Sequence, residues 1–402
     1  MSFKITPSYQ SYVIAFITLF LFLAATNVQG GWLYIIDSLL VSLLVFSLIS
    51  PISQIKKLNI TRVFNKSIYE GEKLEIQVVI DNKSNRNASF LEISDTKIKR
   101  KNDKNTTIIP EEKAKFFVEL NSKEITTFKY SVKPELRGVY LFEKFIISSY
   151  GAFGLFKFSK TINVHDELVV LPNLTNLNSL FFSAIKGAGY KYSSKSRNNL
   201  DATLPYNIRE YRRGDNRKLV HWRSTARHNK LMVKELESEQ SLSIQIILDT
   251  QKGMNTGLGK ESSFEYFIKF AGSILKLCIE KSHRADFIYY QNEKINTLTD
   301  ETSIRQILDN LAHINNDSKI RVRELLKEKE IDSNSVIIPF FLNPDEKDIE
   351  LLSEMYRNNY SVMPIFAEIN SFDKGNFPIK DVIAKCPFKY ITIKQGEKLT
   401  GI

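Results

Sequence analysis

Two apolar runs near the amino terminus constrain this fold more than any other feature of the sequence. They occupy residues 12–28 and 32–49, and only Gln29, Gly30 and Gly31 separate them. A bilayer core about 30 Å thick requires roughly 17 to 25 mostly apolar residues in each helix that crosses it. Both runs meet that length, so residues 1–54 are expected to form a two-helix transmembrane anchor.

Charged flanks predict the orientation of this hairpin. Lys4 precedes the first helix and Lys56, Lys57, Arg62 and Lys66 follow the second, whereas the turn is uncharged. Because Lys and Arg are retained on the cytoplasmic side, both termini and the soluble domains are expected in the cytoplasm. A cleaved signal peptide is the alternative for the first run. The second run follows at once, however, and the sequence shows no small-residue cleavage site at which a signal peptide would be removed.

Residues 55–172 show the two-residue period of β-strands. Leu74, Ile76, Val78 and Ile80 fall at every second position, and turn-forming stretches such as residues 81–85 interrupt the pattern. Short strands with no helical stretch between them predict a β-sandwich-like domain. Further strands are expected at residues 115–120, 125–132, 139–148 and 153–158, and a basic loop at residues 95–104.

Residues 173–402 alternate strand and helix patterns and are expected to form an α/β domain. Such alternation predicts a doubly wound, largely parallel sheet, on which ligands normally meet the carboxyl ends of the strands. The expected strands are residues 243–248, 285–290, 335–341, 360–366 and 390–393, and the expected helices are residues 264–279, 303–312 and 345–357.

Net charge indicates which kind of partner to expect, and cysteine content indicates the redox state of the compartment. The formal net charge of +11 points toward anionic partners, whether lipid headgroups, nucleic acid or an acidic protein. Cys278 and Cys386 show neither metal-ligand spacing nor a disulfide framework. That pattern fits a reducing compartment.

The densest basic stretch lies at residues 208–239. Arginines near Tyr211 and Trp222 suit phosphate contacts and base stacking, whereas the interleaved Glu210 and Asp215 offer ion-pair partners. Basic runs are more often solvated or paired. The block is therefore interpreted as structural or partner-binding, and nucleic-acid binding is the less favoured alternative.

A short helix is expected inside this basic block. Leu219, Trp222 and Ala226 recur at helical spacing, which would give the helix one buried face. Asp215 or Asn216 is placed to cap its amino terminus. The arginines of the block would then point outward or pair with carboxylates.

Fixed spacings within the block carry a family resemblance. The residues concerned are Arg209-Glu210-Tyr211, Gly214-Asp215, Arg217, His221-Trp222, Ala226-Arg227 and Leu231-Met232-Val233-Lys234-Glu235. This pattern resembles the signature of the domain of unknown function 58 family. Arg137-Gly138-Val139-Tyr140 and Phe153-Gly154-Leu155-Phe156 also look like the family's pattern, although Gly151-Ala152 stands where proline is frequent.

The resemblance implies properties that composition and spacing do not show. It implies a von Willebrand factor A-like domain at the carboxyl end, in a protein of the bacterial inner membrane. It also implies partnership with a MoxR-type AAA+ ATPase, often alongside other membrane-bound von Willebrand A proteins. The biochemical activity of the family is unassigned.

A von Willebrand A domain can hold Mg²⁺ at Asp-x-Ser-x-Ser after its first strand, where the side chains supply oxygen ligands. The equivalent residues here are Asp249-Thr250-Gln251-Lys252-Gly253. Gln251 and Gly253 replace the serines, and Lys252 brings a positive charge. We therefore expect no metal or other cofactor, and we expect Asp249 to cap the following turn.

The sequence favours a non-enzymatic membrane adaptor, because neither a nucleophile elbow nor a phosphate loop accompanies the isolated histidines. Two alternatives remain open: a metal-dependent recognition site at Asp249, and membrane-proximal nucleic-acid binding through the arginines. The candidate partner-binding residues are Arg212, Asp215, Arg217, His221, Trp222, Arg227 and Asp249.

Overall fold

The structure is a computed structural model, and the chain forms two compact units. Unit 1 comprises Met1–Asn173 and Leu308–Ile314, and unit 2 comprises Leu174–Ile307 and Asn315–Ile402. The residues that the structure describes are 3–96, 98–101, 103–108, 114–177, 205–212, 217–236, 242–299, 303–328, 331–373 and 383–397.

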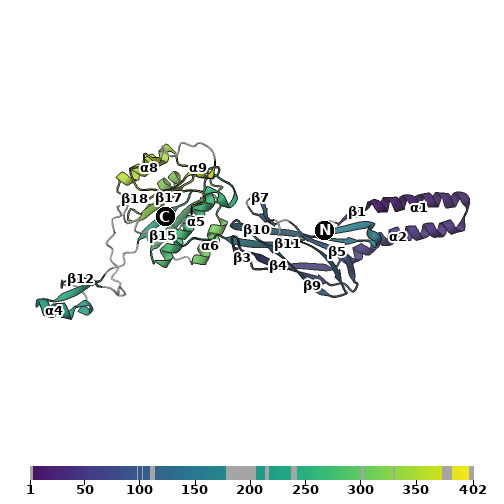
Figure 1. Ribbon diagram of the computed structural model, residues 1–402, viewed down its shortest axis with the longest axis horizontal. Helices are drawn as coiled ribbons and strands as arrows, with labels where there is room; N and C mark the ends of the chain where they lie inside the picture. Colours follow the sequence, from purple (N-terminus) through teal and green to yellow (C-terminus); the bar gives the residue numbers. More distant parts are fainter. Residues whose placement is uncertain are drawn as a thin grey trace. The chain divides into compact units, whose positions relative to one another are not determined.

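The two apolar runs form antiparallel helices, α1 (Tyr9–Val28) and α2 (Gly31–Ile55), which lie side by side (Figure 1). Both are long and apolar enough to cross a membrane. Gln29, with a left-handed φ of 52°, and Gly30 make the turn between them. The predicted helices are confirmed, and α2 continues through Pro51 beyond its predicted end.

Two sheets make up most of the rest of unit 1 and share one hydrophobic core, as expected of a sandwich. The smaller sheet has the order β2 (Leu58–Val63), β4 (Leu74–Asn82), β9 (Ile125–Val132). The larger sheet has the order β1 (Phe3–Pro7), β11 (Phe156–Leu171), β10 (Gly138–Tyr150), β5 (Ala88–Asp95), β8 (Lys115–Leu120), with β3 (Ser67–Tyr69) beside β11.

Strand β1 was not expected from the sequence. It precedes α1 directly and pairs antiparallel with β11, from Phe3 opposite Lys160 to Pro7 opposite Phe156. Strand β2 begins at Leu58, soon after α2 ends at Ile55. The β-domain therefore holds the chain on both sides of the hairpin.

Two predictions for this domain are wrong. The strand expected at residues 153–158 begins only at Phe156, because Phe153 has a φ of 56° inside a 3₁₀ turn, η1 (Ala152–Gly154). The expected basic loop at residues 95–104 contains two short strands, β6 (Ile98–Arg100) and β7 (Asp103–Ile108). Strand β6 pairs with β10, so backbone hydrogen bonds override the low strand propensity of Lys99.

Arg137 and Gly138 are closely surrounded by other residues of unit 1. Arg137 is fully buried, and its Nη1 donates hydrogen bonds to the carbonyl oxygens of Leu311 and Ile314 in the same unit. Gly138 has a φ of 139°, and a Cβ there would lie 2.6 Å from Nε of Arg100. A larger residue at Gly138 would therefore displace the Arg100 side chain.

A buried ion pair joins the two sheets of the sandwich. Arg62 of β2 donates through Nε and Nη2 to both carboxylate oxygens of Asp95 of β5, at 2.8 and 2.7 Å. Its Nη1 bonds Asp166 of β11 at 3.1 Å, and Tyr130 of β9 donates to Asp95 at 2.6 Å. The guanidinium also lies 4.0 Å from the ring centroid of Phe145. Arg62 is thus a core residue and not one of the surface charges that flank the hairpin.

We expect Arg62→Met to cost roughly 3 to 5 kcal/mol, because it leaves the Asp95 carboxylate buried without its cation. Hydrogen–deuterium exchange of the β4 and β9 amides in the full chain measures the loss. Arg86→Met, at an exposed arginine, is the matched control and should change stability by less than about 0.5 kcal/mol. Equal exchange in both variants would contradict the structural role of the ion pair.

In unit 2 a largely parallel sheet has the order β16 (Lys294–Leu298), β15 (Arg284–Gln291), β14 (Ser243–Ile247), β17 (Val336–Phe341), β19 (Ile365–Ala367), β20 (Ile391–Ile393). Helices cover both faces. Phe267 and Phe270 of α5 (Ser263–Glu280) contact Phe340, whereas α7 (Val322–Glu328) and α8 (Glu346–Arg357) pack in the core cluster that contains Phe341.

The predicted strands and helices of this sheet are confirmed. Helix α7 was not predicted, and two further differences concern the strands. Strand β16 is an antiparallel edge that the sequence analysis did not include. The strand expected at residues 360–366 is divided into β18 (Ser361–Val362) and β19, because Pro364 between them has no amide N–H to donate. The helix expected at residues 303–312 is α6 (Ile304–His313).

Candidate partner-binding site

The basic block folds as a small separate element of unit 2. Strands β12 (Pro205–Glu210) and β13 (Met232–Leu236) pair antiparallel, and η2 (Arg217–Leu219) and helix α4 (Trp222–His228) connect them. Val220 and Val233 form a bridge between these parts, and both side chains are buried. These two valines are the buried apolar residues that join β13 to the segment before α4.

His221 is the amino-terminal cap of α4. Its Nδ1 accepts from the Ser224 amide at 3.2 Å and lies 2.7 Å from the Ser224 hydroxyl oxygen. Its own amide donates to the Met232 carbonyl at 2.8 Å. The predicted cap at Asp215 or Asn216 is wrong, because the helix begins later, at Trp222; both residues lie outside the described part of the chain. His221 thus positions α4.

Trp222 contradicts the predicted buried face. Its side chain is 71% exposed, Ala226 is exposed, and Leu219 is only half-buried. The expected spacing assumed one continuous helix, but Leu219 belongs to η2 and precedes the start of α4. The three residues consequently do not share a helix face, and Val220 takes the buried position.

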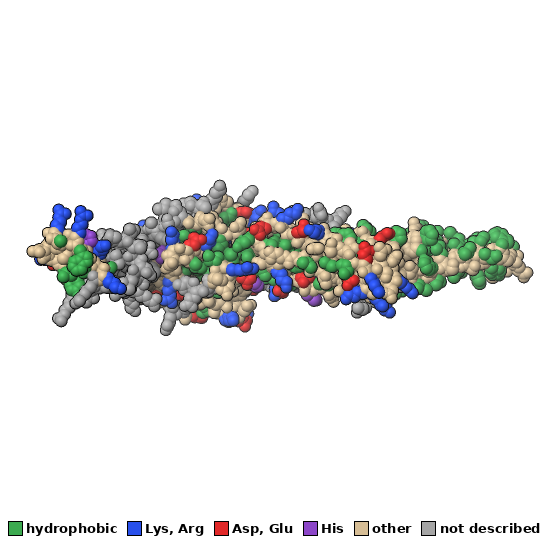
Figure 2. Space-filling model, turned by 90° about the horizontal axis from the view of Figure 1, so that it is seen from below, with side chains coloured by type: hydrophobic (Ala, Val, Ile, Leu, Met, Phe, Trp, Pro, Cys, Tyr) green, Lys and Arg blue, Asp and Glu red, His purple; other side chains and the backbone are tan. Residues whose placement is uncertain are grey.

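Cationic side chains accompany the exposed tryptophan. Arg212, Arg223 and Arg227 are exposed, and Leu231 is 47% exposed after the helix. Figure 2 shows Lys and Arg side chains beside a hydrophobic patch at the end that carries α4. Only the backbone of Arg217 is described. We call the surface formed by Trp222, Arg223, Arg227 and Leu231 the tryptophan patch.

One exposed ion pair connects the end of β12 to the turn before β13. Lys230 donates to Glu210 at 2.7 Å, and this exposed contact raises the pKa of the lysine. Glu210 lies at the end of β12, so the pair joins that strand to the turn before β13. Part of the basic block is therefore paired, as the interleaved acids predicted.

Asp249 lies in a different place, at the carboxyl end of β14. Its Oδ1 accepts from the Gln251 amide at 3.0 Å, and its Oδ2 accepts from the Leu342 amide at 3.2 Å. Burial raises the pKa of Asp249 to about 6, although both amides act in the opposite direction. The carboxylate caps the turn after β14, as expected, and also ties that turn to the end of β17.

An acidic and basic cluster near Asp249 was missed by the sequence analysis. Asp345 and Asp348 form a capping box at the start of α8, and Arg323 donates to both carboxylate oxygens of Asp345 at 2.9 and 2.7 Å. Arg321 pairs with Asp345 as well. Burial raises the pKa of Asp348 to about 6. An acid three residues after Asp345 was the available signal.

A cleft of about 660 Å³ opens where strands β14, β17, β19 and β20 end. The loop 253–258 forms one wall, and Asn343, Phe372 and Gln395 contribute to the others. Gly257 needs a φ of 85° there, and a Cβ would lie 2.9 Å from the Glu261 carbonyl oxygen. This is the edge at which doubly wound sheets normally bind ligands.

The structure does not bring all candidate residues together. Arg212, His221, Trp222 and Arg227 belong to the β12–α4–β13 element, whereas Asp249 belongs to the large sheet of unit 2. Over the described ranges, His, Cys, Asp and Glu form no group of three that could hold a metal ion. Both oxygens of Asp249 are already engaged by backbone amides.

Comparison with known families gives one match. Residues 207–360 match the family described as "Protein of unknown function DUF58". The matched segment contains most of the β12–α4–β13 element and the sheet strands from β14 to β17. The match supports the family resemblance over this part of the chain. No curated protein matches the sequence.

Solved structures show only distant similarity. The CARDB domain of PF1109 from Pyrococcus furiosus is 11% identical, with a TM-score of 0.19 over 28% of this chain and 94% of that chain. A beta-glucosidase from Listeria innocua is 15% identical, with a TM-score of 0.20 over 29% of this chain and 16% of that chain. Similarity at this level supports no functional argument.

We expect Asp249→Ala to destabilise the sheet in unit 2 by roughly 1 to 3 kcal/mol, because the buried Leu342 amide loses its acceptor. The half-buried Gln251 amide loses its acceptor as well. Hydrogen–deuterium exchange at Gln251 and Leu342 reports the loss. Asp317→Ala, at an exposed acid, is the control and should leave these amides protected. Titration heat with Mg²⁺ or Mn²⁺ that disappears in Asp249→Ala would instead indicate a metal site.

Proposed function

We propose that this chain is a membrane-tethered adaptor that binds a protein partner. In this proposal α1 and α2 anchor it in a bacterial inner membrane, the β-sandwich acts as a spacer, and unit 2 is a von Willebrand A-like domain that carries the binding surface. The proposed partner is a MoxR-type AAA+ ATPase, together with other membrane-bound von Willebrand A proteins, as the family resemblance implies.

One observation carries the binding role: Trp222 is 71% exposed. Tryptophan and arginine are enriched among the residues that dominate protein–protein binding energy. Arg223 and Arg227 follow Trp222 on α4. The His221 cap and the Val220–Val233 bridge connect this helix to the rest of the element. The tryptophan patch is thus an exposed apolar and cationic surface, suited to an acidic partner that has an apolar pocket.

The flanks of the hairpin support the proposed orientation. Lys4, Lys56, Lys57 and Lys66 are exposed, so four of the five flanking cations remain available after Arg62 is assigned to the core. Strand β1 pairs with β11 of the β-domain, and β2 of the same domain follows α2 closely. A domain fixed to both ends of the hairpin would lie on one side of the membrane, and the lysines favour the cytoplasmic side because Lys and Arg are retained there.

Crosslinking in native membranes, followed by affinity purification and mass spectrometry, tests the adaptor role. An AAA+ ATPase should be recovered with the wild-type chain and lost with Trp222→Ala and with Arg227→Glu. Both side chains are exposed, so these substitutions should leave the fold intact. Arg305→Glu, at an exposed arginine of α6, is the matched control and should retain the partner.

Full recovery of the ATPase with both folded variants would place the binding surface elsewhere. Recovery of no ATPase from any chain would remove the proposed partner.

Nucleic acid is the second candidate ligand, because an exposed tryptophan between arginines can stack on a base while the cations contact phosphates. Binding of this kind weakens steeply with salt as counterions are released. Gel shifts with single-stranded DNA and RNA at two salt concentrations measure it. We expect no salt-sensitive shift that depends on Trp222, and a shift lost in Trp222→Ala would favour nucleic acid over the protein partner.

A further inference from the structure

The tip that joins β10 to β11 packs directly against the helical hairpin. A Cβ at Gly151 would collide with the carbonyl oxygen of Ser47 in α2, so the tip backbone touches that helix. The Ser47 hydroxyl donates to the Ala152 carbonyl at 3.1 Å. At the start of α1, the Ser8 amide donates to the Leu155 carbonyl at 2.9 Å. The tip is therefore fixed against both helices.

These contacts place the tip beside apolar turns of α2. The membrane-compatible part of that helix ends at Ile52, and Ser47 precedes this end by five residues. At a rise of 1.5 Å per residue, Ser47 lies about 8 Å inside the apolar segment. Leu43, which also faces the tip, lies about 13 Å inside it. The tip therefore lies beside the part of α2 that the hydrocarbon core of a bilayer would surround.

The composition and hydrogen bonding of the tip suit that depth. Residues 151–156 carry no charged side chain. Non-helical backbone at membrane depth is tolerated only where its polar groups have partners. Here the Gly151 amide donates to the Phe156 carbonyl at 2.9 Å, the Gly154 amide donates to the Gly151 carbonyl at 2.9 Å, and the Leu155 amide donates to the Ala152 carbonyl at 3.3 Å.

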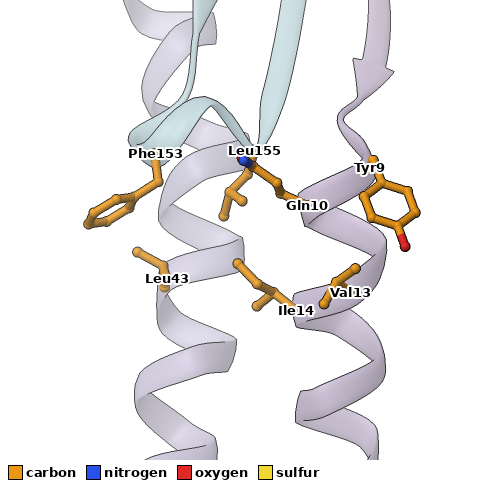
Figure 3. A pocket seen from close by; sticks show the side chains of 7 residues that line it. All are labelled: Tyr9, Gln10, Val13, Ile14, Leu43, Phe153 and Leu155. Atoms are coloured by element: carbon orange, nitrogen blue, oxygen red, sulfur yellow. The ribbon is translucent and has the colours of Figure 1, made fainter.

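Two apolar side chains of the tip point in different directions. Leu155 is buried, whereas Phe153 is 78% exposed and has the left-handed φ of 56°. Figure 3 shows Phe153 alongside α2, above Leu43. An open apolar cleft of about 480 Å³ lies here between the tip and the helices, lined chiefly by Tyr9, Val13, Ile14, Leu43, Phe153 and Leu155.

We propose that this tip is a third membrane element of the chain: Phe153 inserts among the lipids, and an acyl chain of a bilayer phospholipid occupies the cleft. The proposal rests on the proposed membrane anchoring of α1 and α2. The cleft continues the lipid-facing surface of that hairpin, since Val13, Ile14 and Leu43 belong to the two apolar spans. Exposed lysines at both ends of the hairpin, Lys4 and Lys56, suit the anionic headgroups of such lipids.

Quenching by brominated lipids tests the insertion in the full chain. The sequence contains two tryptophans, Trp32 in α2 and Trp222 in α4. Three single-tryptophan chains are reconstituted in vesicles of phospholipid brominated on the acyl chain. The first is W222F, which keeps Trp32 within the hairpin. The second is W32F/W222F/F153W, with the probe at the tip. The third is W32F/W222F/Y69W, the matched aromatic control.

Tyr69 is 40% exposed and pairs with Leu171, at the end of β11 opposite the tip. The length of β11 puts it roughly 50 Å from the tip at about 3.3 Å per residue. We expect the W222F and F153W chains to lose most of their emission, and the Y69W chain to keep it.

The two ways of failing are distinguishable. Quenching in the W222F chain with no more quenching in the F153W chain than in the Y69W chain would overturn the insertion of the tip and leave the anchor intact. Absence of quenching in the W222F chain would refute the membrane hairpin itself, and the tip proposal with it.

Discussion

The guanidinium of Arg62 lies fully buried between two β-sheets, and unit 1 depends on its being paired. A buried cation without a partner costs several kcal/mol, so Asp95 of β5 and Asp166 of β11 must meet it. Tyr130 of β9 in turn donates to Asp95. Arg62 follows α2 by only seven residues. The requirement to pair it therefore fixes the chain that leaves the hairpin within the core of the β-domain.

The chain that enters the hairpin is fixed by a different interaction. Strand β1 adds to the edge of the larger sheet beside β11, and the tip at Gly151 closes against Ser47 of α2. Together these contacts hold the helices and the β-domain as one unit in place of an anchor joined to a flexible linker.

In unit 2, the buried contacts that stabilise the sheet and the exposed side chains of the proposed binding surface belong to different elements. The two carboxylate oxygens of Asp249 accept hydrogen bonds from backbone amides that follow the ends of two strands, β14 and β17. The nearby arginines and acids pair with one another at the start of α8. By contrast, the β12–α4–β13 element buries two valines and leaves its tryptophan in solvent. These contacts favour the tryptophan patch over Asp249 as the proposed binding surface.

The sequence by itself determined the hairpin, the two kinds of sheet and the cap at Asp249, because apolar length, periodicity and turn chemistry are local properties. Only the tertiary structure decided that Arg62 is buried, that Phe3–Pro7 form a strand and that Trp222 is exposed. Each depends on a partner far along the chain, or on where a short helix begins. From the sequence, Arg62 is interpreted as a charge that flanks the hairpin, but the fold places Asp95 beside it. Trp222 is predicted to be buried, but α4 begins at this residue and leaves it exposed.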